Sequence, residues 1–299
     1  MTAYLKAKGI PLRTARGDPF FALGLAKCSP TRYDGKRQYY NNKNWKAGLL
    51  LETITSRKNA YIRHVRILAS DGSYRREQGE YLCDGIKTLR EALTYGARVT
   101  SVLWKNQAGE ILLPVETRQY LAPGELFDYA SPMQNSPGPL FTVAIRGCGK
   151  PGKLKNAIIL EGVQDPGNVG TVIRTANAFG MDAVILTGAC ADLYHPKTVR
   201  ASMGAIFRQT VLELDRDLLS PFLKDQGLPL YAAALDERAV DVRKVSLQHA
   251  AVAVGSEGRG LSPEMIAECD QTVIIPMGPD SESLNAAIAA AVLMWEACR

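Results

Sequence analysis

The sequence predicts an α/β protein in two parts: a small α/β domain followed by a larger domain built on a mainly parallel sheet. At 299 residues the chain has room for about two domains. In the second half, apolar runs alternate with helical patterns, which is typical of a parallel sheet covered on both faces. Between the halves lies "GCGKPGKLKN" (147–156), whose Gly, Pro and Lys content indicates a linker. We therefore divide the chain into residues 1–45, 46–147 and 148–299.

Residues 1–45 show no clear periodicity and interleave cations with aromatic side chains, among them Tyr33, Tyr39, Tyr40 and Trp45. Cations can neutralise phosphates while aromatic rings stack on unpaired bases, so one interpretation is an RNA-binding arm. The alternative is a flexible or poorly packed extension. The residue pattern leaves both open.

Residues 46–147 alternate between helical and strand-like patterns, as a small α/β domain does. In residues 55–70, apolar Ile62, Val65 and Leu68 recur at helical spacing. Gly96 marks the end of a second helix. The expected helices are 55–70, 86–97 and 124–130, and the expected strands are 79–85, 98–106, 111–116 and 138–146.

Residues 148–299 alternate more regularly. Short apolar runs predict buried strands, and the Ala-rich segment 283–297 predicts a closing helix that can pack tightly against another surface. Ligands in such sheets bind at the carboxyl ends of the strands. The expected strands are 157–161, 183–187, 205–211, 228–234, 250–255 and 271–276.

The composition, 46% hydrophobic and 22% charged, is that of an ordinary globular protein. No apolar run approaches the roughly 20 residues of a membrane span. Lys and Arg interrupt the N-terminus too often for a secretory signal. The six cysteines form no C-x-x-C pair and the three histidines are far apart, so we expect reduced thiols, a cytoplasmic location and no metal site.

The net charge of +6 is unevenly distributed. Residues 1–150 hold 23 Lys and Arg against 12 Asp and Glu, a net charge of +11, whereas residues 151–299 hold 13 against 18, a net charge of −5. The basic half predicts a polyanion-binding part, with a solvated basic surface as the alternative.

Three turns follow strands of the second half. The first is "EGVQDPGNVGTVIRTANAFG" (161–180), which matches neither of the common nucleotide-binding patterns, G-x-x-x-x-G-K-[ST] and G-x-G-x-x-G. Asn168 is expected to cap the helix that runs through Phe179. Arg174 shares a helix face with Gly170, which leaves room for Arg174 or a ligand, although a solvent-exposed Arg explains the pattern as well.

The second turn is "VGSEGRGLSPEM" (254–265), whose glycines allow close backbone approach to a ligand or simply a tight turn. Ser262 and Pro263 are expected to begin another helix. The third is "IIPMGPDSESLNAAIAAA" (274–291), where Ser283 or Ser281 is expected to cap the final helix, with Asn285 in its first turn.

Together, in this order and spacing, these turns closely resemble the three motifs of the SpoU/TrmH family of the SPOUT class, whose members are S-adenosylmethionine-dependent RNA ribose 2′-O-methyltransferases. The segment "HPKTVRASMGAIF" (195–207) also resembles the family. Residues 50–147 resemble the RNA substrate-binding domain often fused ahead of it, related to ribosomal proteins.

The resemblance implies a trefoil-knotted methyltransferase domain, a homodimer and a structured RNA substrate. It implies that Gly255, Gly260, Ile275, Met277 and Leu284 bind S-adenosylmethionine. Ribosomal RNA is favoured over transfer RNA, because the leading domain resembles ribosomal-type RNA binders.

The resemblance also implies a catalytic set, which is Asn168, Arg174, Glu257, Ser283 and Asn285. Arg174 is then a base or a phosphate anchor. Since the pKa of Arg is roughly 12 or above, we favour phosphate binding and stabilisation of the developing oxyanion. A non-catalytic RNA-binding or ribosome-assembly factor with the same fold is the main alternative, followed by a base methyltransferase and, more distantly, a dinucleotide-dependent oxidoreductase.

Overall fold

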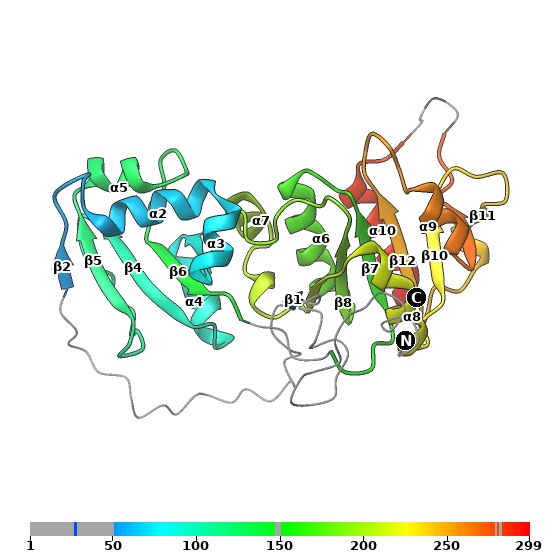
Figure 1. Ribbon diagram of the computed structural model, residues 1–299, viewed down its shortest axis with the longest axis horizontal. Helices are drawn as coiled ribbons and strands as arrows, with labels where there is room; N and C mark the ends of the chain where they lie inside the picture. The colour runs from blue at the N-terminus through cyan, green and yellow to red at the C-terminus, as the bar shows by residue number, and fades with distance from the viewer. Residues whose placement is uncertain (1–26, 29–50, 147–150, 279, 281–282) are drawn as a thin grey trace, which may run out of the picture.

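The computed structural model describes residues 27–28, 51–146, 151–278, 280 and 283–299. Two sheets organise these residues, one in residues 51–146, here called the N-terminal unit, and one mainly in residues 151–299, the C-terminal unit (Figure 1). Most of the extension and the first part of the linker, 1–26, 29–50 and 147–150, lie outside the described residues, so the interpretations of residues 1–45 stay predictions.

The C-terminal unit contains an eight-stranded sheet in the order β1-β9-β8-β7-β12-β10-β13-β11. Every pair in it is parallel except that of β1 with β9, which confirms the mainly parallel sheet. The strands are β1 (Lys27–Cys28), β7 (Ala157–Glu161), β8 (Ala183–Thr187), β9 (Val211–Glu213), β10 (Leu230–Ala233), β11 (Val240–Asp241), β12 (Ala251–Gly255) and β13 (Gln271–Ile274).

Helices cover both faces of this sheet, as the alternation of side chains along its strands requires. In β7, Ile158 and Leu160 pack against α6 (Pro166–Ala178) and α10 (Ala286–Cys298). Ala157 and Ile159 face the opposite layer, α8 (Arg216–Gln226) and α9 (Pro263–Glu268). The remaining helices of this unit are α7 (Pro196–Ala201), η1 (Ala205–Phe207) and η2 (Val242–Lys244).

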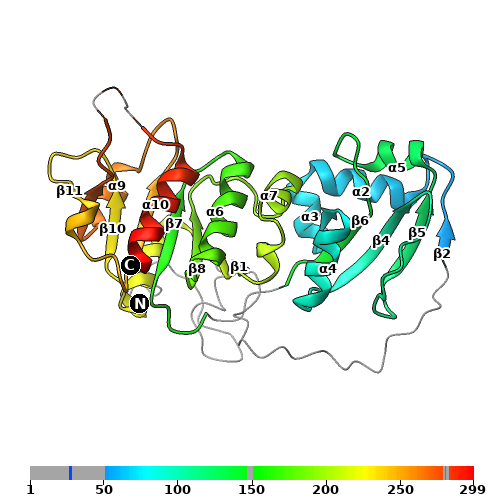
Figure 2. The ribbon, with the colours of Figure 1, turned by 180° about the vertical axis from the view of Figure 1, so that it is seen from behind.

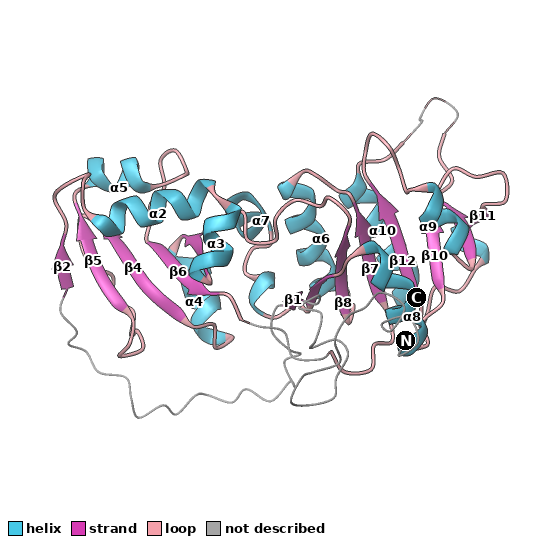
Figure 3. Cartoon of the chain, in the orientation of Figure 1, coloured by secondary structure: helices cyan, strands magenta, loops and turns pink. Residues whose placement is uncertain are grey.

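The N-terminal unit has a five-stranded sheet in the order β2-β5-β4-β6-β3, with β6 antiparallel to its neighbours (Figure 3). One face packs on α2 and α5, where Ile62, Val65 and Leu68 of α2 are fully buried as predicted. The elements are β2 (Leu51–Thr53), α2 (Ala60–Ser70), α3 (Gly72–Gln78), β3 (Glu80–Asp84), α4 (Ile86–Thr94), β4 (Val99–Lys105), β5 (Arg118–Ala122), α5 (Gly124–Ala130) and β6 (Leu140–Ala144).

Two expected strands are wrong. Residues 111–116 form no strand, because their run contains Pro114 and leaves Leu112 63% exposed; the strand lies after it, at β5. In residues 205–211, the apolar side chains of Ala205–Phe207 are buried by a 3₁₀ turn, and β9 begins only at Val211. Burial alone does not distinguish a strand from a helical turn in so short a run.

The two units meet around α7, which lies between α3 and α6 in both views (Figures 1 and 2). The contact has an apolar part, in which the rings of Tyr81 and Tyr194 lie 4.6 Å apart between centroids. The buried residues on this side of both sheets form one continuous cluster. The units therefore share packing across their boundary.

The trefoil knot stays a prediction from the family resemblance, because strand order alone does not establish how the chain threads.

Within the described residues, no helix combines the length and apolar character that crossing a membrane requires.

Candidate functional site

The first motif forms the turn between β7 and α6. Asp165, not Asn168 as expected, caps α6: its Oδ1 accepts a hydrogen bond from the backbone N–H of Asn168 at 2.9 Å, with Pro166 at the start of the helix. The helix begins earlier than predicted because Asp165 and Pro166 together make a stronger start signal. Asn168 thus lies in the first turn, with its side chain free for other contacts.

The second motif folds back on itself after β12. Ser256 and Gly260 exchange backbone hydrogen bonds of 3.2 and 2.9 Å, and Gly260 has a positive φ of 67°. A Cβ on Gly255 would lie 2.1 Å from the carbonyl carbon of Gly260. Glycine at 255 is therefore required by the turn itself. Ser262 caps α9 as predicted, accepting from the N–H of Met265 at 3.1 Å.

The third motif leads into α10. Asn285, and not Ser283, is the cap: its Oδ1 accepts from the N–H groups of Ala287 at 2.9 Å and Ile288 at 3.3 Å. The expectation for Ser283 is wrong because the helix starts later, at Ala286, and Ser281 lies outside the described residues. Ser283 is instead exposed at the mouth of a pocket.

One chain of side-chain hydrogen bonds joins the three motifs. The Nδ2 of Asn168 donates to Oε1 of Glu257, and its Oδ1 accepts from Nδ2 of Asn285 at 3.2 Å. These residues are separated by 89 and 117 positions in sequence. Their meeting is a result of the fold, and it brings together three of the five predicted catalytic residues.

Beside this cluster lies a pocket of about 400 Å³ at the carboxyl ends of β10, β12 and β13. All five predicted cofactor-binding residues line it: Gly255, Gly260, Ile275, Met277 and Leu284. Glu257 and Ser283 also line it, so the pocket and the cluster share a boundary. Its volume is in the range of small-molecule sites, about 300–1,000 Å³.

Arg174 lies apart from this arrangement. It is exposed on α6, and among the described residues no hydrogen bond or ion pair joins it to the other candidates. Arg174 follows Asn168 by six positions, which in an α-helix corresponds to about 9 Å along the axis and roughly 120° around it. The expected space beside Gly170 is filled by α7, because a Cβ there would lie 2.3 Å from the carbonyl O of Thr198.

Sequence reasoning missed Lys197 and Glu161. The Nζ of Lys197 lies 2.7 Å from Oδ2 of Asp165, and this hydrogen bond lowers the pKa of Asp165. Glu161, at the end of β7, accepts hydrogen bonds from the N–H and the hydroxyl of Ser262, both at 2.8 Å. Lys197 follows the Pro of the family-like 195–207 segment, and this position was the signal that could have identified it.

No group of three or more His, Cys, Asp or Glu side chains in the described part of the chain is placed to hold a metal ion. The thiols of Cys83, Cys190, Cys269 and Cys298 are free. Burial raises the pKa of Cys83 well above its usual value and that of Cys190 above its usual value.

Known proteins are similar to this chain in sequence and in fold. The model of the SpoU rRNA Methylase family matches residues 155–295. An uncharacterized tRNA/rRNA methyltransferase of Synechocystis sp. is 31% identical over 261 residues, which cover 83% of this chain and 94% of that protein. The 23S rRNA (guanosine(2553)-2'-O)-methyltransferase RlmP of Bacillus subtilis is 29% identical over 82% of this chain and 98% of its own.

Among solved structures, an AdoMet-bound rRNA methyltransferase from Sinorhizobium meliloti is similar with a TM-score of 0.73 and 25% identity. The match covers 83% of this chain and 97% of that one. The similarity therefore extends over both units and is not confined to residues 155–295.

Proposed function

Because the chain belongs to the SpoU rRNA methylase family, we propose that it transfers a methyl group from S-adenosylmethionine to a ribose 2′-hydroxyl of ribosomal RNA. The observation that carries the proposal is the Asn168–Glu257–Asn285 cluster at the edge of the pocket. It joins the three motifs in one place, where a cofactor and a ribose could meet.

The residues of the pocket fit the proposed cofactor. Ile275, Met277 and Leu284 offer apolar contacts for an adenine ring and a methionine chain. The Gly255–Gly260 turn brings backbone polar groups to the wall of the pocket, together with Glu257 and Arg259. When bound, S-adenosylmethionine supplies an electrophilic methyl group on a good leaving group.

The task left to the protein is alignment and proton removal. Asn168 is held at both ends, so the carboxylate of Glu257 has a fixed position from which to orient a ribose hydroxyl. Ser283 and Asn285 complete the rim of the site. Exposed Arg174 contacts none of these residues in the protein alone; it serves as a phosphate anchor that stabilises the developing oxyanion once RNA is bound. Lys197 adds a second cation near the same helix.

We propose the domain boundaries 46–147 and 148–299, with the first domain engaging RNA. Exposed cations along and just before α2 support this role, since Arg57 and Arg66 both lie over the ring of Tyr129, at 4.5 and 4.0 Å. Stacked guanidinium groups can contact phosphates while presenting a planar surface to a base. The name of the B. subtilis relative supports ribosomal RNA over transfer RNA.

We further propose a homodimer and a cytoplasmic location. The dimer is supported by exposed apolar side chains on α10, with Ile288 and Trp295 52% and 55% exposed. Seven residues apart, they share one helix face, which a second copy of the chain would cover. The location is supported by the four free thiols.

The test is to incubate the full chain with labelled S-adenosylmethionine and unmodified bacterial ribosomal or transfer RNA, then digest the RNA and identify its nucleosides by mass spectrometry. A 2′-O-methylnucleoside from ribosomal RNA is expected. A base-methylated product would refute the ribose assignment. Cofactor binding with no product on either RNA would support the assembly-factor alternative.

A further inference from the structure

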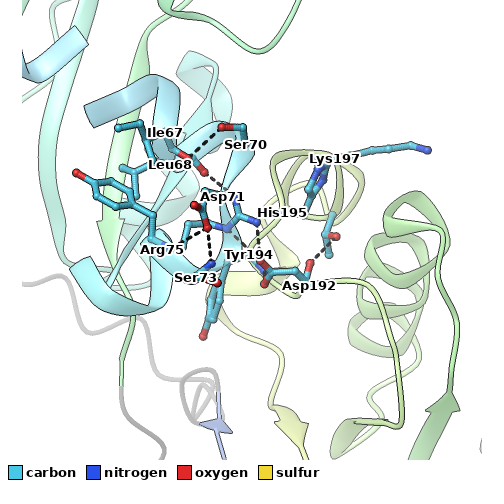
Figure 4. Close-up of polar contacts among 12 residues, drawn as sticks. Ile67, Leu68, Ser70, Asp71, Ser73, Arg75, Asp192, Tyr194, His195 and Lys197 are labelled. Carbon is cyan, nitrogen blue, oxygen red and sulfur yellow. Dashed lines mark hydrogen bonds and ion pairs between the residues drawn. The ribbon is translucent and has the colours of Figure 1, made fainter. Parts of the chain in front are cut away.

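A partly buried ion pair crosses the contact between the two units. Arg75, on α3, is 2% exposed, and its guanidinium donates from Nε at 3.0 Å and from Nη2 at 2.5 Å to Oδ2 of Asp192, in the loop after β8 (Figure 4). Its Nη1 donates to the carbonyl O of Leu68 at 2.5 Å. Gly72 makes the approach possible, because a Cβ there would lie 2.9 Å from the same Asp192 oxygen.

The partner of Arg75 also organises the start of α7. The Oδ1 of Asp192 accepts from the N–H of Tyr194 at 3.0 Å, and its carbonyl O accepts from the hydroxyl of Thr198 at 3.0 Å and the N–H of His195 at 3.1 Å. Asp192 therefore uses both its side chain and its backbone to fix the turn that leads into this helix.

Helix α7 in turn contacts the start of α6 at two points. Its Thr198 carbonyl packs against Gly170 with no space for a side chain, and its Lys197 holds Asp165, the cap of α6. Asn168 lies between these two contacts. A shift of α7 would move the first turn of α6 and the cluster attached to it.

We infer that Arg75 is a positioning residue for methyl transfer. Through Asp192 and α7, it links the position of the N-terminal unit to the position of Asn168. This inference rests on the proposed function. Its physical basis is that a displacement of about 1 Å at reacting groups can lower a rate about a hundredfold. A unit that binds RNA would in this way be held in register with the site that modifies it.

The experiment is a double-mutant cycle in the full chain with Arg75→Met, Asp192→Asn and the double variant. The measured quantities are kcat, KM for RNA, Kd for S-adenosylmethionine and the melting temperature. We expect each single variant to lower kcat at least about tenfold, with the cofactor Kd changed less than about threefold. The double variant is expected to be no slower than the slower single variant.

A second interface pair gives a matched control. Arg208 also crosses the contact, with Nη1 2.5 Å from Oε2 of Glu91 and Nε donating to Asn177 at 2.8 Å, but Asn177 lies at the far end of α6. We expect Arg208→Met to lower the melting temperature while kcat stays within about threefold of wild type. An equal loss of kcat in this control would overturn the inference, because it would indicate general loosening of the interface.

The remaining outcomes are separable. Unchanged kcat in folded Arg75→Met, or additive losses in the cycle, would refute the role of Arg75 while an active wild type upholds the proposed function. An inactive wild type would refute the proposed function and the inference with it. If Arg75→Met fails to fold, Arg75→Lys is used, which keeps the charge but not the forked guanidinium, and its kcat is expected to be lower than that of wild type. A kcat equal to that of wild type would then refute the role of Arg75.

Discussion

The side-chain amide of Asn168 uses both of its ends in the cluster, donating to Glu257 and accepting from Asn285. It can do so because Asp165 caps the helix in its place. An Asn fixed at both ends has a defined orientation, and the carboxylate it holds is fixed with it. The exposed Arg174 has no such fixed contact among the described residues, which suits a side chain that waits for a phosphate.

At the residue scale, Arg174→Ala is expected to lower kcat by about a hundredfold to a thousandfold, the usual effect of removing one oxyanion-stabilising donor. The Kd for S-adenosylmethionine is expected to stay within about threefold, because Arg174 does not line the pocket. Isothermal titration and single-turnover methylation measure the two quantities. Lys224→Ala, which removes an exposed cation from α8 on the opposite face of the sheet, is the control and is expected to keep full activity. Full activity of Arg174→Ala would exclude the proposed role.

The second prediction at this scale concerns pH. Burial and the charge of Arg75 lower the pKa of His195, whose Nδ1 accepts from the N–H of Lys197 at 3.1 Å. Because the pKa is lower in the folded than in the unfolded protein, the unfolded chain binds more protons as pH falls below about 6.5. Stability is therefore full above that pH and declines below it.

His195→Asn keeps a capping acceptor but cannot titrate. We expect its melting temperature to fall less than that of wild type between pH 7.5 and 5.5. Melting curves by circular dichroism at several pH values measure the difference. If the melting temperatures of the two proteins fall equally with decreasing pH, another group causes the loss of stability in acid.

At the scale of elements, the strands of the C-terminal unit were predictable because each buried strand leaves a short apolar run between turn signals. One wrong prediction arose where a strand and a helical turn would bury the same run of apolar residues. Ala205–Phe207 is apolar whether it forms a strand or a 3₁₀ turn, and its burial as a turn depends on packing against α6, which is distant in sequence. Segment 111–116 shows the opposite error, in which Pro114 outweighs the apolar residues around it.

Part of the site could be predicted in the same sense. The motifs named Asn168, Glu257 and Asn285 by resemblance, and the fold brings them together. The cap of α6 could have been assigned to Asp165, because Pro166 follows it at the first helical position. The cap of α10 could not, because Ser283 and Asn285 are equally good acceptors and differ only in where the helix starts. Nothing local to Arg75 or Asp192 indicates that they pair across 117 positions.

The contact between α6 and α7 gives a prediction about Gly170. In an exposed helix, Gly→Ala usually stabilises by up to about 1 kcal/mol. At Gly170 the new Cβ would meet the Thr198 carbonyl at 2.3 Å, so we expect Gly170→Ala to destabilise the protein by about 1–3 kcal/mol instead. The sign of the change in urea unfolding decides between these. Gly152→Ala, with no atom near its Cβ, is the control, and stabilisation by Gly170→Ala would contradict the close approach.

At the scale of the whole molecule, the shared apolar cluster and the Arg75–Asp192 ion pair connect the two units, while α10 presents apolar surface to solvent. Trp295 packs edge-on against Phe179 at 5.8 Å and is still more than half exposed. Such a side chain on the outer face of a helix is a typical centre for an interface.

We therefore expect Ile288→Ser with Trp295→Ser to shift the protein from dimer to monomer, raising the dimer Kd by at least about a hundredfold. Sedimentation velocity at several concentrations measures this. Leu112→Ser, which removes a side chain of 63% exposure from the N-terminal unit, is expected to leave the dimer unchanged. A wild-type chain that sediments as a monomer at all concentrations would refute the proposed dimer.

The cluster that joins Asn168, Glu257 and Asn285 can form only late in the synthesis of the chain. The ribosome makes Asn168 well before Glu257, and Asn285 after both, so a nascent chain with most of its sheet already folded still has no complete pocket. Leu284 and the first turn of α10 close it last. With the pocket as the proposed cofactor site, a chain that ends before this late segment is expected not to bind S-adenosylmethionine.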